Sequence, residues 1–236
     1  MVVFNFLITL AAALLPTLIW LVFFLKEDVH PEPRKLLLYT FAIGAIISLP
    51  VLATQIIFQG VHSFFPPLLQ TTLVLVLGLA LIEEVFKFLA AYWAVNDKSA
   101  FDEPIDAMIY MITAALGFAT IENIFIIGNS FDLLNKVMLG STLSTILLRF
   151  VGATFLHTLS SGLLGYYWAR GRAKKTIATS LTFGLILATI LHAVFNYLIL
   201  KFQNTNLLYP SLFLIVALFF ILNDFEKLKM SRAKLE

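Results

Sequence analysis

Seven long apolar runs, joined by short polar connections, dominate this sequence of 236 residues. A helix needs about 20 apolar residues to cross a bilayer, and each run approaches or exceeds that length. Hydrophobic residues make up 60% of the chain and charged residues 13%, unlike a soluble domain. The sequence therefore predicts an all-α fold, a polytopic transmembrane helical bundle of about seven spans forming a single integral membrane domain over residues 1–236. The expected spans are 3–25, 36–58, 68–95, 105–128, 143–169, 177–200 and 207–222.

Basic residues predict the orientation of these spans. Of the 16 Lys and Arg, 12 lie in connections on the side of the C-terminus, two (Lys136 and Lys201) lie on the other side, and Lys87 and Arg149 lie within spans. Cytoplasmic loops carry such an excess. We therefore expect a multi-pass protein of the cell membrane with its N-terminus outside and its C-terminus cytoplasmic. The net charge of +2 is too small to indicate nucleic acid as a partner.

The sequence contains no cysteine, which excludes several classes of site. This absence excludes disulfides, thiol nucleophiles, iron–sulfur clusters and cysteine-ligated zinc. The first span has neither a charged n-region nor a small-residue cleavage site, so we expect it to be retained rather than removed as a signal peptide.

Four consecutive spans carry ionisable residues at overlapping predicted depths. Glu83 and Glu84 lie near the middle of the third span, and Glu122 lies in the outer half of the fourth. His157 lies near the middle of the fifth, and His192 lies between the middle and the outer side of the sixth. An ionisable residue near the bilayer centre costs about 2.5–3.5 kcal/mol on insertion scales. A shared site, buried in protein or hydrated, would explain why so many are present.

Helical spacing gives these residues directions. Residues at i and i+4 share a face, so Asn196 points the same way as His192, and Lys87 could pair with Glu83. In that position the Asn196 amide could donate a hydrogen bond to a developing oxyanion. Glu83 and Glu84 point about 100° apart, because a helix has 3.6 residues per turn. We therefore expect the two carboxylates to have different roles.

Structural roles are the alternative for several polar residues. Lys87 and Arg149 lie near enough to span ends to snorkel to the interface. A lone intramembrane histidine can be a hydrogen-bonded packing residue. Close packing rather than catalysis is expected at Ser160, Ser161, Gly117, Gly162, Gly165 and Gly184. Packing explains Glu122, His157 and His192 together less well, because their loss would make insertion easier.

Two imidazoles and a carboxylate form the His₂Glu ligand set of catalytic zinc sites. The predicted ligands are Glu122, His157 and His192, with Glu83 or Glu84 as general base for a water molecule. His157 lies about two turns deeper than the other two ligands at a pitch of 5.4 Å, so the fifth span must tilt for one ion to reach all three. A metal-free alternative has Glu and His activate water together. Either version hydrolyses a peptide bond within or beside the membrane.

In these motifs the chain resembles the PrsW family of intramembrane proteases, relatives of the CAAX prenyl endopeptidases. The motifs are EExxK at Glu83, Glu84 and Lys87, FxxxEN at Phe118, Glu122 and Asn123, a histidine element at His157, and HxxxN at His192 and Asn196. Two flanking stretches, "KEDVHPEPRKLLLYTFAIG" and "DEPIDAMIY", also resemble the family. The similarity covers roughly residues 26–197, which we expect to form the protease core, with a basic cytoplasmic tail at 224–236. The HExxH, GxGD and GxSG motifs of other intramembrane proteases are absent from the sequence.

The resemblance implies a membrane-embedded endopeptidase, treated as a metalloprotease with zinc as the expected cofactor. It implies supporting roles for Lys87 and Asn123. Members of this kind make the first, site-1 type cleavage in membrane-anchored proteins such as anti-sigma factors. The expected partners are therefore such a protein or peptide substrate and the lipid bilayer, and the oligomeric state stays open. Two other classes, a proton-coupled transporter and a non-catalytic membrane scaffold, could use the same intramembrane Glu and His residues.

Overall fold

The computed structural model describes residues 2–130, 152–202 and 208–232, and every regular element within those ranges is a helix. This confirms the predicted all-α fold. The elements are α1 (Val2–Leu25), α2 (Arg34–His62), the short 3₁₀ helix η1 (Pro67–Leu69), α3 (Thr72–Val95), α4 (Asp106–Ser130), α6 (Thr154–Lys174), α7 (Ile177–Phe202) and α8 (Leu208–Arg232).

Five helices, α1, α2, α4, α7 and α8, are long and apolar enough to cross a membrane. A multi-pass helical membrane protein is thus confirmed. Helix α3 is equally long, 24 residues, but carries three ionisable residues, Glu83, Glu84 and Lys87. Within the described residues, the helices follow the predicted spans closely, and residues 143–151 of the expected fifth span lie outside the described residues.

Several ends of helices differ from the sequence prediction by four residues or more: α2 ends at His62 rather than at 58, and α6 ends at Lys174 rather than at 169. The third span was expected to begin at residue 68, but η1 and a separate α3 occupy this stretch because Thr71 caps α3, its side chain accepting from Val74 N at 3.3 Å. Helix α8 continues to Arg232, so the described residues of the expected tail are helical.

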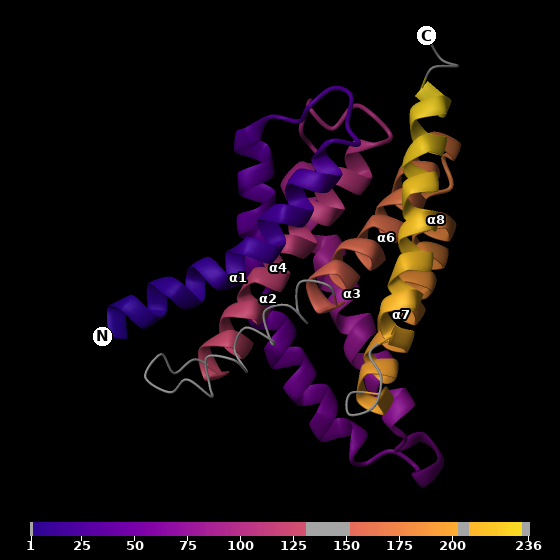
Figure 1. Ribbon diagram of the computed structural model, residues 1–236. Coiled ribbons are helices and arrows are strands. Elements are labelled where there is room, and N and C mark those ends of the chain that lie inside the picture. The colour runs from indigo at the N-terminus through magenta and orange to yellow at the C-terminus, as the bar shows by residue number, and fades with distance from the viewer. Residues whose placement is uncertain (1, 131–151, 203–207, 233–236) are drawn as a thin grey trace.

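The connections gather at two opposite ends of the bundle (Figure 1). The α1–α2 and α3–α4 connections and the C-terminal end of α8 lie at one end, and the α2–α3 connection lies at the other. Contacts agree with this arrangement. Arg172 Nη2, near the end of α6, donates to the carbonyl of Phe101 at 3.4 Å, and Lys229 Nζ of α8 lies 2.8 Å from Glu27 Oε2.

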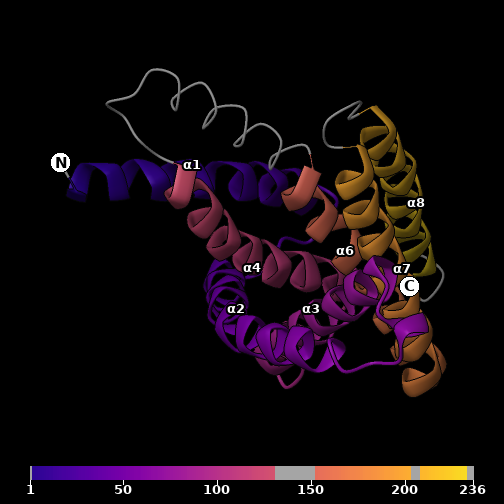
Figure 2. The ribbon, with the colours of Figure 1, turned by 90° about the horizontal axis from the view of Figure 1, so that it is seen from below.

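Helix α4 lies at the centre of the bundle. It packs against α1, α2, α3 and α6, while α6, α7 and α8 stand together on one side (Figure 2). Of its span, 67% is buried, against 28–33% for the other four apolar helices. Most of α4 therefore packs against protein rather than lipid.

Glycines set the closest helix approaches, as predicted for Gly117 and Gly165. A Cβ added at Gly117 would lie 2.0 Å from the Phe41 carbonyl oxygen of α2, and one at Gly165 would lie 2.7 Å from the Ala107 carbonyl oxygen. Small residues at such crossings let helix backbones approach closely. These contacts hold α4 between α2 and α6 and so place Glu122 beside α6.

Candidate active site

Glu84, on α3, is fully buried and accepts hydrogen bonds from four side chains. Its Oε1 accepts from Lys87 Nζ at 2.5 Å, Ser160 Oγ at 2.9 Å and His192 Nδ1 at 2.7 Å. Its Oε2 accepts from Ser161 Oγ at 3.4 Å. Side chains from three helices, α3, α6 and α7, thus converge on one carboxylate. With its oxygens occupied, Glu84 is suited to fix other groups rather than to accept a proton from water.

Glu83 differs from its neighbour, as the 100° turn between them predicted. Its Oε2 is buried and has no hydrogen-bond partner among the described residues. That atom lies 3.5 Å from His192 Nε2 and 3.8 Å from His157 Nδ1, at or beyond the limit of a direct hydrogen bond. A buried oxygen without a partner is unusual, and here it faces two imidazole rings.

Hydrogen bonds to neighbouring side chains orient the two histidine rings. The Nδ1–H of His192 donates to Glu84, so its Nε2 is directed toward Glu83. His157 has Lys87 Nζ at 3.2 Å from Nδ1 and Glu122 Oε2 at 2.9 Å from Nε2. Because an ammonium group only donates, His157 accepts at Nδ1 and donates from Nε2 to Glu122. The two rings lie 5.1 Å apart, nearly perpendicular.

The structure brings together most of the predicted site residues. The expected offset of two turns does not separate Glu122 from His157, whose side chains are in contact. Lys87 does not snorkel: it is fully buried and pairs with Glu84 rather than with the expected Glu83. The matching prediction for Arg149 lies outside the described residues.

Two further predicted residues lie on helices that also carry site residues. Asn123 is buried, and its amide donates to the Ala13 carbonyl and to Thr154 Oγ1, both at 3.2 Å. It therefore ties α1 and α4 to the start of α6, one turn from His157. Asn196 is half-buried, one turn beyond His192 on α7, and its role as an oxyanion donor stays a prediction.

Sequence reasoning missed three polar contacts of the cluster. Ser160 and Ser161 were expected to be packing residues, yet both donate to Glu84. Their spacing of three and four residues from His157, which places them on the histidine face of α6, was the available signal. Gln55, a lone amide in the apolar second span, donates to Glu83 Oε1 at 2.8 Å.

The residues present fit a metal ion. One ligand atom each from Glu83, His157 and His192 can be chosen so that all lie within 4.8 Å of one another. Imidazole nitrogen and carboxylate oxygen are ligands that zinc takes, and carboxylates such as Glu84 commonly hold a metal-binding histidine from behind. When ionised, Glu83, Glu84 and Glu122 carry three negative charges, against one positive charge on Lys87. A divalent cation would balance the remaining two negative charges.

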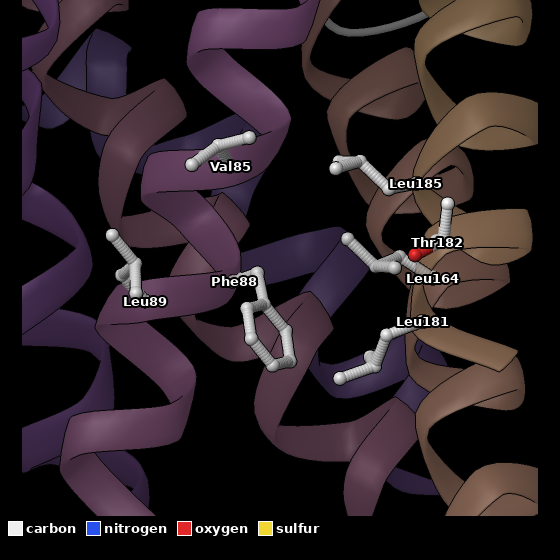
Figure 3. A pocket seen from close by; sticks show the side chains of 7 residues that line it. All are labelled: Val85, Phe88, Leu89, Leu164, Leu181, Thr182 and Leu185. Atoms are coloured by element: carbon white, nitrogen blue, oxygen red, sulfur yellow. The ribbon is translucent and has the colours of Figure 1, made fainter. Parts of the chain in front are cut away.

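A small apolar pocket lies between α3, α6 and α7 (Figure 3). Its lining consists of Val85, Phe88 and Leu89 of α3, Leu164 of α6, and Leu181, Thr182 and Leu185 of α7. Its volume is about 170 Å³. The Thr182 hydroxyl donates to its own helix, to the Ala178 carbonyl at 2.9 Å. The lining side chains therefore offer apolar contacts rather than catalytic groups.

Buried glutamate and histidine side chains among apolar helices of membrane-spanning length are typical of an intramembrane hydrolase. Comparison with known sequences gives the family: residues 32–223 match the PrsW family of intramembrane metalloproteases, and this chain belongs to that family. The match extends beyond residue 197, where the motif resemblance ended, into α8. The chain is therefore a protease by family, as predicted.

Curated relatives agree with this assignment. The chain is 28% identical over 194 residues to "Protease PrsW" of Geobacillus kaustophilus, covering 82% of this chain and 79% of the relative. It is 27% identical over 201 residues to that of Oceanobacillus iheyensis, covering 84% and 86%, and 25% identical over 188 residues to that of Bacillus subtilis, covering 77% and 78%. No solved structure matches the chain.

Proposed function

We propose that this protein hydrolyses a peptide bond of a membrane-anchored protein, with Glu83 as the group that activates water. The observation that supports this most directly is Glu83 Oε2, a buried oxygen without a hydrogen-bond partner that faces His192 Nε2 at 3.5 Å. Glu84 supports the division of roles because Lys87, Ser160 and His192 already occupy it.

The reaction follows from these positions. A water molecule between Glu83 and the imidazoles gives a proton to Glu83 Oε2 while its oxygen attacks the carbonyl carbon of the substrate. The resulting oxyanion needs donors, and Asn196, one turn from His192, is a candidate. When the C–N bond breaks, Glu83 returns the proton to the leaving amine nitrogen. Glu84 keeps His192 in one tautomer throughout.

Zinc is the cofactor we propose for this site. His157 and His192 would hold it with Glu83 or Glu122, and in the latter case Glu83 is free to act as the base. When bound, a divalent ion lowers the pKa of its water to about 7 and polarises the carbonyl. The contacts of His157 with Lys87 and Glu122 mean that one of them must yield before that ring can bind an ion.

We propose that the substrate is a single-pass, anti-sigma-factor-like protein, cut at its first, site-1 type step. This rests on the class of substrate that the family resemblance implies. The burial of the reacting groups among apolar helices favours a bond that lies in or next to a membrane segment.

The test uses purified protein in vesicles of phosphatidylcholine and phosphatidylglycerol. The probe is a synthetic library of single-span peptides, each with 20 apolar residues between randomised flanks, and mass spectrometry identifies the fragments. Wild-type protein should cut a subset. Glu83→Gln should lower the rate about 10²–10⁴-fold, the range for loss of a general base. His157→Ala and His192→Ala should also abolish cleavage.

A matched control is Gln59→Leu, an exposed site on α2 that should cleave normally. Wild-type cleavage by all three site variants would end the catalytic assignment. A non-catalytic scaffold would show no cleavage by any form of the protein, with peptide binding unchanged in Glu83→Gln.

A further inference from the structure

Gln55 of α2 is the neighbour that fixes Glu83. Its Nε2 donates to Glu83 Oε1 at 2.8 Å and reaches the Leu79 carbonyl, one turn earlier on α3, at 3.5 Å. The amide therefore bridges the backbone and the side chain of the same helix. Neither the motifs nor the reaction proposed above uses this residue.

The contact divides the two oxygens of Glu83. Oε1 is satisfied by the amide, while Oε2 has no partner among the described residues and faces the two histidines. The amide restrains the carboxylate at Oε1, which favours the orientation in which Oε2 faces His157 and His192. Without the amide neither oxygen would have a donor among the described residues, and the side chain would be free to turn toward another donor.

A close approach of α2 to α3 makes the bridge feasible. A Cβ added at Gly78 would lie only 2.1 Å from Cζ of Phe58, so this glycine lets the phenyl ring pack directly against α3. Phe58 lies three residues after Gln55 and so about one helical turn away on a similar face. The packing of Phe58 on Gly78 thus sets the distance across which Gln55 reaches Glu83.

The geometry points to Gln55 as a positioning residue that aims Glu83 Oε2 at His157 and His192. This inference rests on the proposed function, because it assigns Gln55 a task in that reaction. Gln55 does not touch the reacting atoms in this role; it acts through Glu83. The role is the same whether Glu83 takes the proton of water or binds a cation, since both need Oε2 in that place.

The discriminating substitution is Gln55→Met, which keeps the length of the side chain and removes the donor. It is assayed on a peptide that the wild type cleaves, in the same vesicles. We expect kcat to fall about 10–100-fold, the effect of losing a hydrogen bond to a charged group. KM should stay within about twofold. Gln59→Met, the same change one turn along α2 at an exposed position, should leave kcat and the melting temperature unchanged.

A second variant, Gln55→Asn, distinguishes a loss of positioning from a loss of folded protein. Gln55→Asn keeps the amide but withdraws it by one methylene, so it should also lower kcat while the melting temperature stays near that of the wild type. Wild-type kcat in both folded variants would overturn the inference, as would a kcat loss that only follows the loss of folded protein. If the wild type cleaves and Glu83→Gln does not, such a result removes the role of Gln55 alone. If the wild type cleaves nothing, the proposed function itself fails.

Discussion

His192 Nδ1 donates to Glu84 Oε1 at 2.7 Å, and this contact joins α7 to α3 at the centre of the site. The same oxygen accepts from Lys87, so the ammonium, the carboxylate and the imidazole form one buried chain. The two adjacent glutamates therefore have different roles. Glu84 accepts a hydrogen bond from His192 and orients it, whereas Glu83 faces its other ring nitrogen. A buried chain of this kind is strong only while every member is present.

Removing Glu84 should damage both folding and cleavage. Glu84→Ala leaves Lys87 buried without its counter-ion, and breaking a buried pair in this way typically lowers the free energy of unfolding by about 3–5 kcal/mol. It also frees His192 to turn. We expect a large drop in the melting temperature of the protein in detergent, together with loss of peptide cleavage.

The double variant Glu84→Ala, Lys87→Met separates the two effects. Because it removes the unpaired charge, it should recover most of the melting temperature and none of the cleavage. Recovered cleavage in the double variant would mean that Glu84 matters for charge balance alone and does not position His192.

Metal content is the next measurable quantity. If the imidazoles hold zinc, the purified protein should carry about one zinc per chain, a chelator should abolish cleavage, and zinc should restore it. His157→Ala and His192→Ala should each lower the bound zinc, whereas Gln59→Leu should not. Full cleavage by metal-free protein would instead favour the mechanism in which Glu and His activate water without an ion.

The all-α class and the approximate positions of the spans could be predicted from the sequence because the bilayer requires long apolar helices. Runs of about 20 apolar residues give the spans, and the glycines at 117 and 165 mark close crossings. The start of α3 was missed because one capping hydroxyl, Thr71, outweighs the apolar residues before it.

The contacts within the site were harder to predict. Depth counted along each span treats the helices as parallel rods, which is why His157 and Glu122 were expected two turns apart although their side chains touch. The partner of Lys87 depended on side-chain direction, because i+3 and i+4 neighbours are both within reach. Gln55 comes from a helix without any motif, and only packing shows that it meets Glu83.

A second carboxylate cluster, centred on Glu32 of the α1–α2 connection, predicts a dependence of stability on pH. Glu32, in the α1–α2 connection, is buried and accepts from the Tyr110 hydroxyl, with the Asp106 carboxyl group beside it. Burial raises the pKa of Glu32, hydrogen bonds with Asp106 and Tyr110 oppose that rise, and the charges of Asp28 and Asp102 add to it. The folded protein therefore keeps a proton on Glu32 at a pH where the unfolded chain has lost it.

The sign follows from proton linkage. A raised folded-state pKa contributes stability that is fully present below the unfolded value of 4.5 and is lost as the pH rises through the folded value. Glu32→Gln, which still accepts from Tyr110, should flatten this fall in melting temperature above pH 4.5. Asp97→Asn, at an exposed carboxylate, should leave the fall in place. An unchanged pH profile in Glu32→Gln would show that Glu32 does not carry the effect.

Orientation in the membrane can be tested cleanly because the chain has no cysteine. Ser63, after α2, and Lys174, at the end of α6, are both exposed. The contact of Arg172 with Phe101 places the C-terminal end of α6 at the end of the bundle opposite the α2–α3 connection (Figure 1). Single cysteines at these two positions should therefore react with a membrane-impermeant maleimide from opposite sides. The 12 to 2 distribution of basic residues predicts that intact cells label Ser63→Cys and that Lys174→Cys reacts only after lysis. Labelling of Lys174→Cys from outside would reverse the orientation, and labelling of both positions from one side would contradict the arrangement of the helices.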